Sequence, residues 1–367
     1  MSIPLRTFIR VPNWGDRLSG WIVSRMGGTI HEVALGADLS SAANGPQNLM
    51  AIGSVLQSAD DHSVVWGSGM ISPDQLGSTK ASFRAVRGKL TAAELEKRGI
   101  TPPTAFGDPA LLMSRFYQPN VPKHYRLGVI PHFVDRDHPV VQQLASLPDV
   151  TVLNVASGIT DFADQVAACE AIVSTSLHGL IAADVYGVPR CQLVLSDRII
   201  GGDFKYRDYA SGAGLENWQA LDLSSAEHYP ALEDVLERCA LMTPQWDAQA
   251  LIDAFPSDLW PSLSQPSPEQ LVRQDLERLE RFVAEAYGPT GYVSTLEKKL
   301  ASSTEKLTSL KTKASEQSAK VQSLKAKLDD TKASAKKLRQ LNADLEKVQR
   351  HPLRSLFLPK SLKRASR

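Results

Sequence analysis

The densest group of chemically capable residues lies between positions 172 and 181. An apolar run typical of a buried strand leads into the hydroxyl side chains of residues 174–176, and His178 follows at the start of an expected helix. Exposed N–H groups and the positive end of a helix suit a phosphate or carboxylate, and a histidine there can contact the anion or transfer a proton. Ser176, Leu177 and His178 are therefore candidate binding residues, and His178 is also a catalytic candidate. The alternative is a serine that caps the helix and a histidine that only packs.

A second group of candidates follows at 197–209. Gly201 and Gly202 allow a tight loop, and Lys205 and Arg207 come soon after them, where both could reach toward the same anion. As an isolated pattern this stretch is typical of a solvated, charged loop. Its assignment to the site therefore depends on the first group.

Two glycine-containing turns follow apolar strand candidates nearer the amino terminus. Asn13 and Asp16 belong to the first turn, and Ser68 belongs to the second turn, at 66–69. Such turns let a backbone approach a substrate closely, so Asn13 and Ser68 are substrate-binding candidates. Asp16 is a candidate general base, although it fits an Asx turn equally well. Neither turn matches G-x-G-x-x-G, so dinucleotide binding is not predicted.

Arg87 and His132 complete the set of candidates. Arg87 could clamp a carboxylate bidentately, and His132 comes just after a predicted strand. The cysteines have spacings that fit neither a disulfide framework nor a zinc site; they are Cys169, Cys191 and Cys239. We expect no metal and no cofactor.

Alternating strand and helix signals must bring these residues together. The predicted strands are 29–35, 63–66, 126–131, 150–155, 171–175 and 190–195, and the predicted helices are 91–98, 140–145, 161–169, 178–186 and 269–287. Thr91 and Glu94 form the pattern of a capping box that would start the first of these helices, and Gly99 would stop it. Apolar strands separated by helices indicate parallel sheets covered on both faces. We predict an α/β protein with two Rossmann-like domains that face each other across a cleft.

The composition divides the chain into five parts. An N-terminal α/β domain is expected at 1–118 and a Rossmann-like domain that contains the 172–181 group at 119–255. A linker rich in Pro and Ser and a closing helix follow at 256–288. A coiled coil is predicted at 289–349 and a basic tail at 350–367.

The coiled-coil prediction rests on a heptad pattern that runs from Val293 to Leu345. Twelve of its sixteen a and d positions are apolar, and no Pro or Gly interrupts them. Asn342 at one of these positions would favour a single register. We expect a homo-oligomer through this segment; the alternative is a solvated single helix.

The formal net charge of +1 hides two oppositely charged parts. Residues 289–367 hold 19 Lys and Arg against 7 Asp and Glu, which leaves 22 basic and 33 acidic residues in 1–288. The acidic body does not predict a nucleic-acid partner, whereas the basic end predicts peripheral contact with an anionic membrane. No apolar stretch is long enough to span a bilayer, and the first residues lack the apolar run of a signal peptide. A cytoplasmic protein at the inner face of the membrane is the expectation.

Taken together, an ordered set of motifs resembles the polysaccharide pyruvyl transferases. The motifs occur at 13–16, 66–69, 86–91, 107–112, 131–132, 174–181 and 204–209 and cover about residues 8–212. The resemblance implies a fold similar to the two-domain GT-B glycosyltransferases, with phosphoenolpyruvate as the donor. It also implies that Arg87 and His178 hold the carboxylate and phosphate of that donor. Several members carry arginine at the position of Ser176; serine there resembles a succinoglycan-ketolase-like subgroup, and Lys205 or Arg207 would compensate.

The function implied by this resemblance is transfer of a pyruvyl group to sugar hydroxyls of a polysaccharide or its lipid-linked precursor. The product would be a ketal, with release of phosphate. Two alternatives stay open: a GT-B glycosyltransferase that uses a nucleotide sugar, and a non-catalytic coiled-coil scaffold for polysaccharide assembly.

Overall fold

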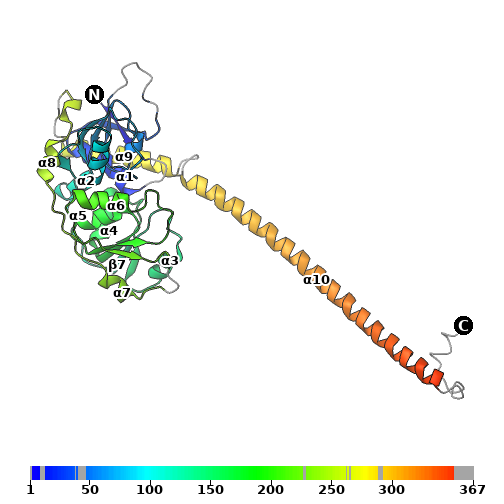
Figure 1. Ribbon diagram of the computed structural model, residues 1–367. Helices are drawn as coiled ribbons and strands as arrows, with labels where there is room; N and C mark the ends of the chain where they lie inside the picture. Colours follow the sequence, from blue (N-terminus) through cyan, green and yellow to red (C-terminus); the bar gives the residue numbers. More distant parts are fainter. Residues whose placement is uncertain are drawn as a thin grey trace. The chain divides into compact units, whose positions relative to one another are not determined.

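The computed structural model describes residues 2–8, 13–37, 39, 47–225, 229–261, 263, 266–287 and 292–350 (Figure 1). The chain divides into two units, residues 1–292 and 293–367. The first unit holds all the strands and the second consists mainly of one long helix. The predicted basic tail at 350–367 lies outside the described residues, except for Arg350.

The first sheet has six parallel strands in the order β2-β1-β3-β4-β5-β6. The strands are β1 (Ile3–Thr7), β2 (Ile30–Ala34), β3 (Asn48–Met50), β4 (Ser63–Trp66), β5 (Ser82–Val86) and β6 (Ala105–Phe106). Every residue of β1, β3 and β4 is buried. Such short, fully buried strands are typical of a parallel sheet with both faces covered.

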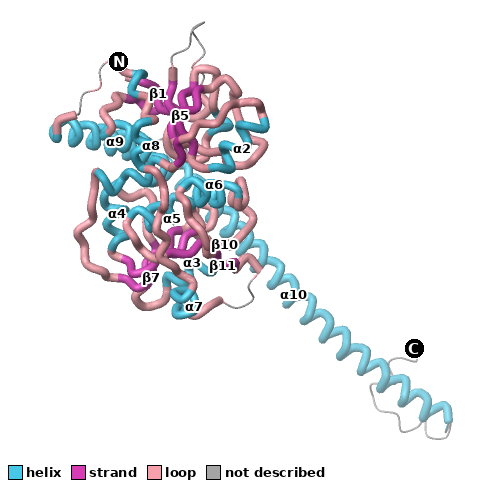
Figure 2. The backbone as a smooth tube through the Cα atoms, turned by 60° about the vertical axis from the view of Figure 1, so that its left-hand side comes forward, coloured by secondary structure: helices cyan, strands magenta, loops and turns pink. Residues whose placement is uncertain are grey.

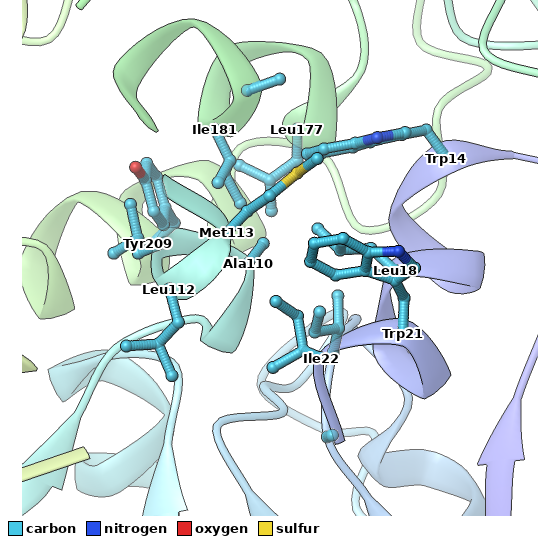
Figure 3. Close-up of a cluster of buried hydrophobic side chains, with 14 of the residues drawn as sticks. Trp14, Leu18, Trp21, Ile22, Ala110, Leu112, Met113, Leu177, Ile181 and Tyr209 are labelled. Carbon is cyan, nitrogen blue, oxygen red and sulfur yellow. The ribbon is translucent and has the colours of Figure 1, made fainter. Parts of the chain in front are cut away.

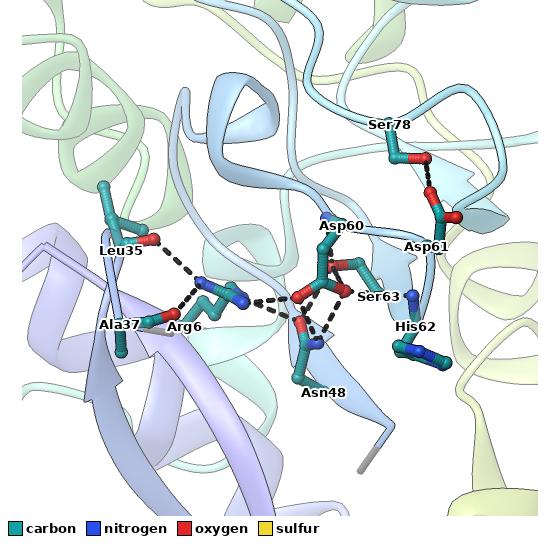
Figure 4. A network of polar contacts seen from close by, with 9 residues as sticks. All are labelled: Arg6, Leu35, Ala37, Asn48, Asp60, Asp61, His62, Ser63 and Ser78. Atoms are coloured by element: carbon teal, nitrogen blue, oxygen red, sulfur yellow. Dashed lines mark hydrogen bonds and ion pairs between the residues drawn. The ribbon is translucent and has the colours of Figure 1, made fainter. Parts of the chain in front are cut away.

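The buried charge of Arg6 on β1 is satisfied by a polar network (Figure 4). Its guanidinium donates to Asn48 Oδ1 at 3.0 Å, to Leu35 O at 2.8 Å and to Asp60 Oδ2 at 2.5 Å. A buried cation needs such partners. The network ties together the residues that follow β2, the start of β3 and the loop before β4.

The second sheet has five parallel strands in the order β11-β10-β9-β7-β8. They are β7 (Tyr125–Ile130), β8 (Val150–Val152), β9 (Cys169–Ser174), β10 (Arg190–Val194) and β11 (Ala220–Asp222). In chain order, each sheet therefore begins with the same arrangement: its first strand lies between its second and third. In such a sheet the crossovers leave the first strand in opposite directions, which opens a crevice at the carboxyl ends of the first and third strands. The two crevices are at β1 and β3 and at β7 and β9.

Helices surround and connect the sheets, as the tube in Figure 2 shows. They are α1 (Trp14–Arg25), α2 (Lys89–Lys97), α3 (Pro139–Ala145), α4 (Ile159–Ala167), α5 (Leu177–Val185), α6 (Phe204–Gly212) and α7 (Leu232–Glu237), with short 3-10 helices at Leu56–Ser58 and Pro109–Arg115. One apolar core runs from the first sheet to the second. In Figure 3, Trp14 and Leu18 of α1 lie beside Met113 of a 3-10 helix and beside Leu177 and Ile181 of α5. Burial of this shared core fixes α1 and α5 in one body.

After the second sheet, the chain returns to the first. This segment contains α8 (Ala248–Asp253), a 3-10 helix (Ser257–Leu259) and α9 (Pro268–Tyr287). Trp66 Nε1 on β4 donates to Leu251 O at 2.8 Å, and Trp260 Nε1 donates to Thr29 O at 2.9 Å. Arg25 at the end of α1 pairs with Asp275 of α9 at 2.7 Å.

Most of the predicted strands and helices are confirmed within one or two residues. The predicted strand 150–155 is shorter, because β8 ends at Val152. The capping box is wrong: α2 begins at Lys89 after Gly88, and the hydroxyl of Thr91 donates to Asp208 instead. Gly99 does end that helix, with a φ of +73°. Residues 204–212, expected as a charged loop, form α6.

A single uninterrupted helix, α10 (Tyr292–Arg350), makes up the described part of the second unit. Among the described residues, no helix combines the length and apolar character needed to cross a bilayer. The side chains at several apolar heptad positions of α10 are more than half exposed; they are Leu307, Leu310, Val321, Leu324, Leu328 and Leu338.

Candidate functional site

A cleft of about 330 Å³ lies where the carboxyl ends of the two sheets meet. The first sheet contributes residues that follow β1 and β3, including 13–16 and 53–55. The second sheet contributes residues that follow β7 and β9, including 131–134 and 176–179. Both crevices therefore open into the same cavity, which is the arrangement expected of a substrate site in doubly wound sheets.

The first wall of the cleft is the beginning of α1. Asn13 caps this helix, and its Oδ1 accepts a hydrogen bond from Asp16 N at 3.0 Å. The side-chain amide of Asn13 also donates to the carboxylate of Asp16. Burial raises the pKa of Asp16 to about 7, and the hydrogen bond from Asn13 offsets only part of that increase. Asp16 can therefore take up or release a proton near neutral pH.

The opposite wall is the first turn of α5, which carries His178. Burial, together with the positive charges of Arg87 and Lys205, lowers the pKa of His178 to about 3. Its Nε2 is inaccessible to water and has no hydrogen-bond partner among the described residues. The ring lies so close to Gly15 that a Cβ there would overlap it. His178 is thus a neutral imidazole that the backbone of α1 holds in place, and the hydrogen-bonding capacity of its buried Nε2 is unused among the described residues.

Two of the three hydroxyls at 174–176, those of Ser174 and Thr175, form hydrogen bonds that stabilise the turn itself. Ser174 Oγ lies 2.8 Å from Ile130 O and accepts from Ser176 N at 2.9 Å. Thr175 Oγ1 accepts from His132 N at 2.8 Å, which ties the end of β7 to the end of β9. The side chain of Ser176 makes no capping hydrogen bond and lines the cleft. Of the three hydroxyls, Ser176 is therefore the one placed to meet a ligand.

His132 and Lys205 line the same cleft. Burial lowers the pKa of His132 to about 4, and the Lys205 charge adds to this effect. Lys205 is 8% exposed, and burial followed by the charge of Arg87 lowers its pKa to about 8. A lysine this buried favours an anion as its partner. Among the described residues, no carboxylate forms an ion pair with Lys205.

Arg87, Ser68 and Arg207 are not among the residues that line the cleft. Arg87 is fully buried and donates to Asp208 at 2.9 Å and to Ser54 Oγ at 2.5 Å. It lies behind Ser54, which does line the cavity. Ser68 Oγ donates to Ala51 O at 2.9 Å, and the side chain of Arg207 is 68% exposed beside Asp203.

The charges and dipoles around the cleft suit an anionic ligand. The first turns of α1 and α5 both line it, and the positive ends of helices stabilise anions. Lys205 adds a full positive charge, and Arg198, at the rim, pairs with Asp135 at 3.1 Å. Within the described ranges, no group of three or more His, Cys, Asp or Glu side chains could hold a metal ion.

Comparison with known proteins finds similarity to one described family and to two proteins. The profile of the polysaccharide pyruvyl transferase family matches residues 75–191. The chain is 26% identical to the succinoglycan biosynthesis protein ExoV of Rhizobium meliloti over 212 residues, which are 55% of this chain and 62% of that protein. It is also 26% identical to an uncharacterised protein of Acanthamoeba polyphaga mimivirus over 226 residues, or 59% of this chain and 77% of that protein.

Over residues 75–191 the chain is similar to the polysaccharide pyruvyl transferases. The family segment carries Arg87, His132 and the 174–179 turn. Asn13, Asp16 and Lys205 lie outside that segment, yet they line the same cleft. The cleft is therefore built from more of the chain than the matched segment alone.

Several residues that line the cleft were not predicted from the sequence. Gly53, Ser54 and Val55 line the cleft after β3, but β3 has only three residues, too few to give a clear strand pattern. Phe162 of α4 lines it as well and packs against Trp14, with ring centroids 5.2 Å apart. Asp208, the partner of Arg87, lay in a motif that was noted, but nothing in its spacing indicated the pairing.

Proposed function

We propose that this protein transfers a pyruvyl group from phosphoenolpyruvate to sugar hydroxyls of a polysaccharide or its lipid-linked precursor. The product is a ketal and the leaving group is phosphate. The observation that carries this proposal is that Lys205, His178 and two helix N-termini line one cleft, and that His178 Nε2 has no hydrogen-bond partner within the described part of the chain. Such a cleft offers both a positive potential and directional hydrogen bonds to a donor that bears a phosphate and a carboxylate.

The chemistry requires proton transfer as well as anion binding. A proton must reach the methylene carbon of the donor while an acceptor hydroxyl attacks the central carbon. Phosphate then leaves, and a second hydroxyl of the sugar closes the cyclic ketal. Because the pKa of Asp16 is about 7, we assign Asp16 to proton transfer at the acceptor hydroxyl.

His178 has a different task in this proposal. Its pKa of about 3 keeps it neutral at physiological pH, so it serves as a hydrogen-bond partner of the donor phosphate. Lys205 stabilises the charge that develops on the departing phosphate. The space around the donor and acceptor is lined by Ser176, Leu177, Asn13 and His132. Arg87 acts from behind Ser54.

The architecture that we propose is GT-B-like. Two parallel sheets of the same initial strand order face one cleft, and the C-terminal segment of the body returns to pack against the first sheet. These features support the proposal, because a site between two Rossmann-like halves lets each half hold one substrate.

The heptads of α10 support a coiled coil, the structure predicted from the sequence. The exposed seam of Leu307, Leu310, Leu324 and Leu328 is apolar surface that a partner helix would bury. The homo-oligomer expected from the sequence stays a prediction. The cytoplasmic location and the contact with the inner face of the membrane stay predictions, since residues 351–367 lie outside the described part of the chain.

The test is release of phosphate from phosphoenolpyruvate by the purified protein, with a panel of sugar and lipid-linked acceptors. We expect acceptor-dependent release that His178→Ala reduces by at least about 100-fold. His62→Ala, at an exposed position, is the matched control and should retain wild-type turnover. Far-UV circular dichroism confirms that both variants are folded.

Two results would contradict the proposal. One is a folded His178→Ala variant with normal turnover. The other is a folded wild-type protein that does not bind phosphoenolpyruvate in calorimetry, which would favour a glycosyltransferase that uses a nucleotide sugar or a scaffold.

A further inference from the structure

The positions that flank the apolar seam of α10 carry an unusual charge pattern. Between residues 304 and 344, the g positions of the heptads include four lysines: Lys306, Lys313, Lys320 and Lys327. The e positions include four more basic residues: Lys311, Lys325, Lys332 and Arg339. No Asp or Glu occupies an e or g position in this stretch.

This pattern opposes pairing of α10 with a second copy of itself. In a parallel pair, each g residue faces the e residue five positions later on the other helix, so Lys306 would face Lys311 and Lys320 would face Lys325. In an antiparallel pair, g faces g and e faces e, which again brings lysines together. Charges at e and g set partner choice in coiled coils, and like charges at such positions disfavour association.

The acidic residues of the same stretch lie away from the seam. Glu305, Glu316, Asp329, Asp330 and Asp344 occupy b, c and f positions. The ion pair from Lys332 to Asp329, at 3.7 Å, joins exposed side chains. An isolated helix stabilised by its own charges would need more acidic residues at a spacing of three or four from the lysines.

The seam itself suits a partner helix better than a membrane surface. Its apolar side chains repeat only at a and d, whereas helices that lie in membranes have a wider apolar face with aromatic residues. No Phe, Trp or Tyr occurs between 304 and 344. Gln317 and Thr331 interrupt the seam with polar groups that can form hydrogen bonds across a helix pair but would be costly in lipid.

We propose that α10 is one strand of a heterotypic coiled coil whose partner helix carries acidic side chains at its e and g positions. The leucines of the seam bury against the apolar seam of that partner. The two rows of basic side chains pair with its carboxylates. The proposal does not depend on the reaction that the body catalyses.

The experiment uses the full-length protein and two synthetic peptides of matching length. The peptides share the same leucine seam, and one carries Glu and the other Lys at every e and g position. Fluorescence anisotropy of each labelled peptide is titrated with the protein at low and high salt. We expect the acidic peptide to bind at least about tenfold more tightly than the basic one at low salt, with a smaller difference at high salt.

A pair of charge-reversal variants separates position from net charge. Lys320→Glu/Lys327→Glu changes two g positions, and Lys336→Glu/Lys337→Glu makes the same change in charge at b and c. The preference is the ratio of the Kd of the basic peptide to the Kd of the acidic peptide. The first variant should lower the logarithm of this ratio by at least about half, and the second should leave the ratio unchanged.

Three outcomes would overturn the proposal. Equal binding of both peptides would remove the charge selectivity. A stable dimer of the protein alone in light scattering, unaffected by excess acidic peptide, would establish self-pairing instead. Flotation with phosphatidylserine vesicles, weakened equally by both variants and without peptide binding, would assign the basic residues to a membrane.

Discussion

Arg87 and Asp208 form an ion pair in which both side chains are fully buried, with 2.9 Å between Nη2 and Oδ2. Arg87 follows β5 of the first sheet, and Asp208 belongs to α6, which comes after β10 of the second sheet. Thr91 N also donates to Asp208 Oδ1 at 2.7 Å. The pair therefore joins the two halves of the body directly behind the cleft. Because α6 also carries Lys205, this contact fixes the position of the ammonium that lines the cavity.

Removal of one partner of this pair should destabilise the body strongly. In Asp208→Ala, the guanidinium of Arg87 stays buried without a counter-charge, and such a loss typically costs about 3–5 kcal/mol of unfolding free energy. Urea unfolding followed by circular dichroism measures the change. The matched control is Asp258→Ala, which breaks the exposed pair with Arg84 and should cost less than about 1 kcal/mol.

The double variant Arg87→Met/Asp208→Leu tests the cause of that loss. An apolar pair of similar volume leaves no unpaired charge, so the double variant should be more stable than Asp208→Ala. Equal stability of Asp208→Ala and Asp258→Ala would show that the buried pair does not hold the two halves together.

The contact between Gly15 and His178 leads to a prediction about activity. Alanine is normally the better helix former, but a Cβ at Gly15 would overlap the imidazole of His178. Gly15→Ala should therefore displace the ring and lower turnover by at least about tenfold. The control is Gly20→Ala in the same helix, where the Cβ would meet the movable carboxylate of Glu32. That variant should keep turnover within about twofold.

Steady-state kinetics and thermal unfolding of both glycine variants distinguish a local from a global effect. A Gly15→Ala protein with normal melting temperature and low turnover supports the contact. Normal turnover of Gly15→Ala would mean that His178 is not held where catalysis requires it.

The sequence predicted the fold better than the details of the site. The strands at 63–66 and 190–194 and the helix of His178 have clear periodicity or turn signals, and they were located within one or two residues. Helix α6 was missed because Lys205, Arg207 and Asp208 looked like a charged loop. Only tertiary contacts show that one face of this helix is buried.

The same limitation applies to the roles of single residues. Asn13, Asp16 and His178 were expected at one cleft because the two predicted Rossmann-like domains face each other across it. The pattern around Arg87 gave no sign that Asp208, 121 residues later, would face it. The sequence suggested that His178 could transfer a proton. Burial and nearby positive charges lower its pKa, and the 172–181 motif alone does not show either of them.

Lys205 should control donor affinity and its loss at high pH. Its pKa of about 8 means that the ammonium loses its charge as the pH rises through that value. KM for phosphoenolpyruvate should therefore increase above about pH 8. Lys205→Met should raise KM by about 10–100-fold at pH 7, because a charged hydrogen bond is lost, and should abolish the alkaline rise.

Arg207→Met provides the matched control for Lys205. This residue is on the same helix, but its side chain is 68% exposed and lies outside the cleft lining. It should leave KM and its pH dependence unchanged. An alkaline rise that persists in Lys205→Met would assign that ionisation to another group.

Asp16 gives a prediction in which activity and stability respond to the same ionisation. If Asp16 accepts a proton from the acceptor hydroxyl, kcat/KM should rise as the pH increases through about 7. Asp16→Asn should lower kcat/KM by at least about 100-fold and remove that rise.

The free energy of unfolding should respond to the same ionisation in the opposite direction, falling as the pH rises. The folded state holds the proton of Asp16 up to about pH 7, whereas the unfolded state releases it near 3.8, so this group's contribution to stability is lost as the pH rises to 7. Between pH 5 and 8, urea unfolding of the wild type should show about 1–2 kcal/mol more loss than that of Asp16→Asn, after allowance for solvent screening. Identical pH dependence in the two proteins would show that Asp16 is ionised in the folded state throughout and that its burial does not set its pKa.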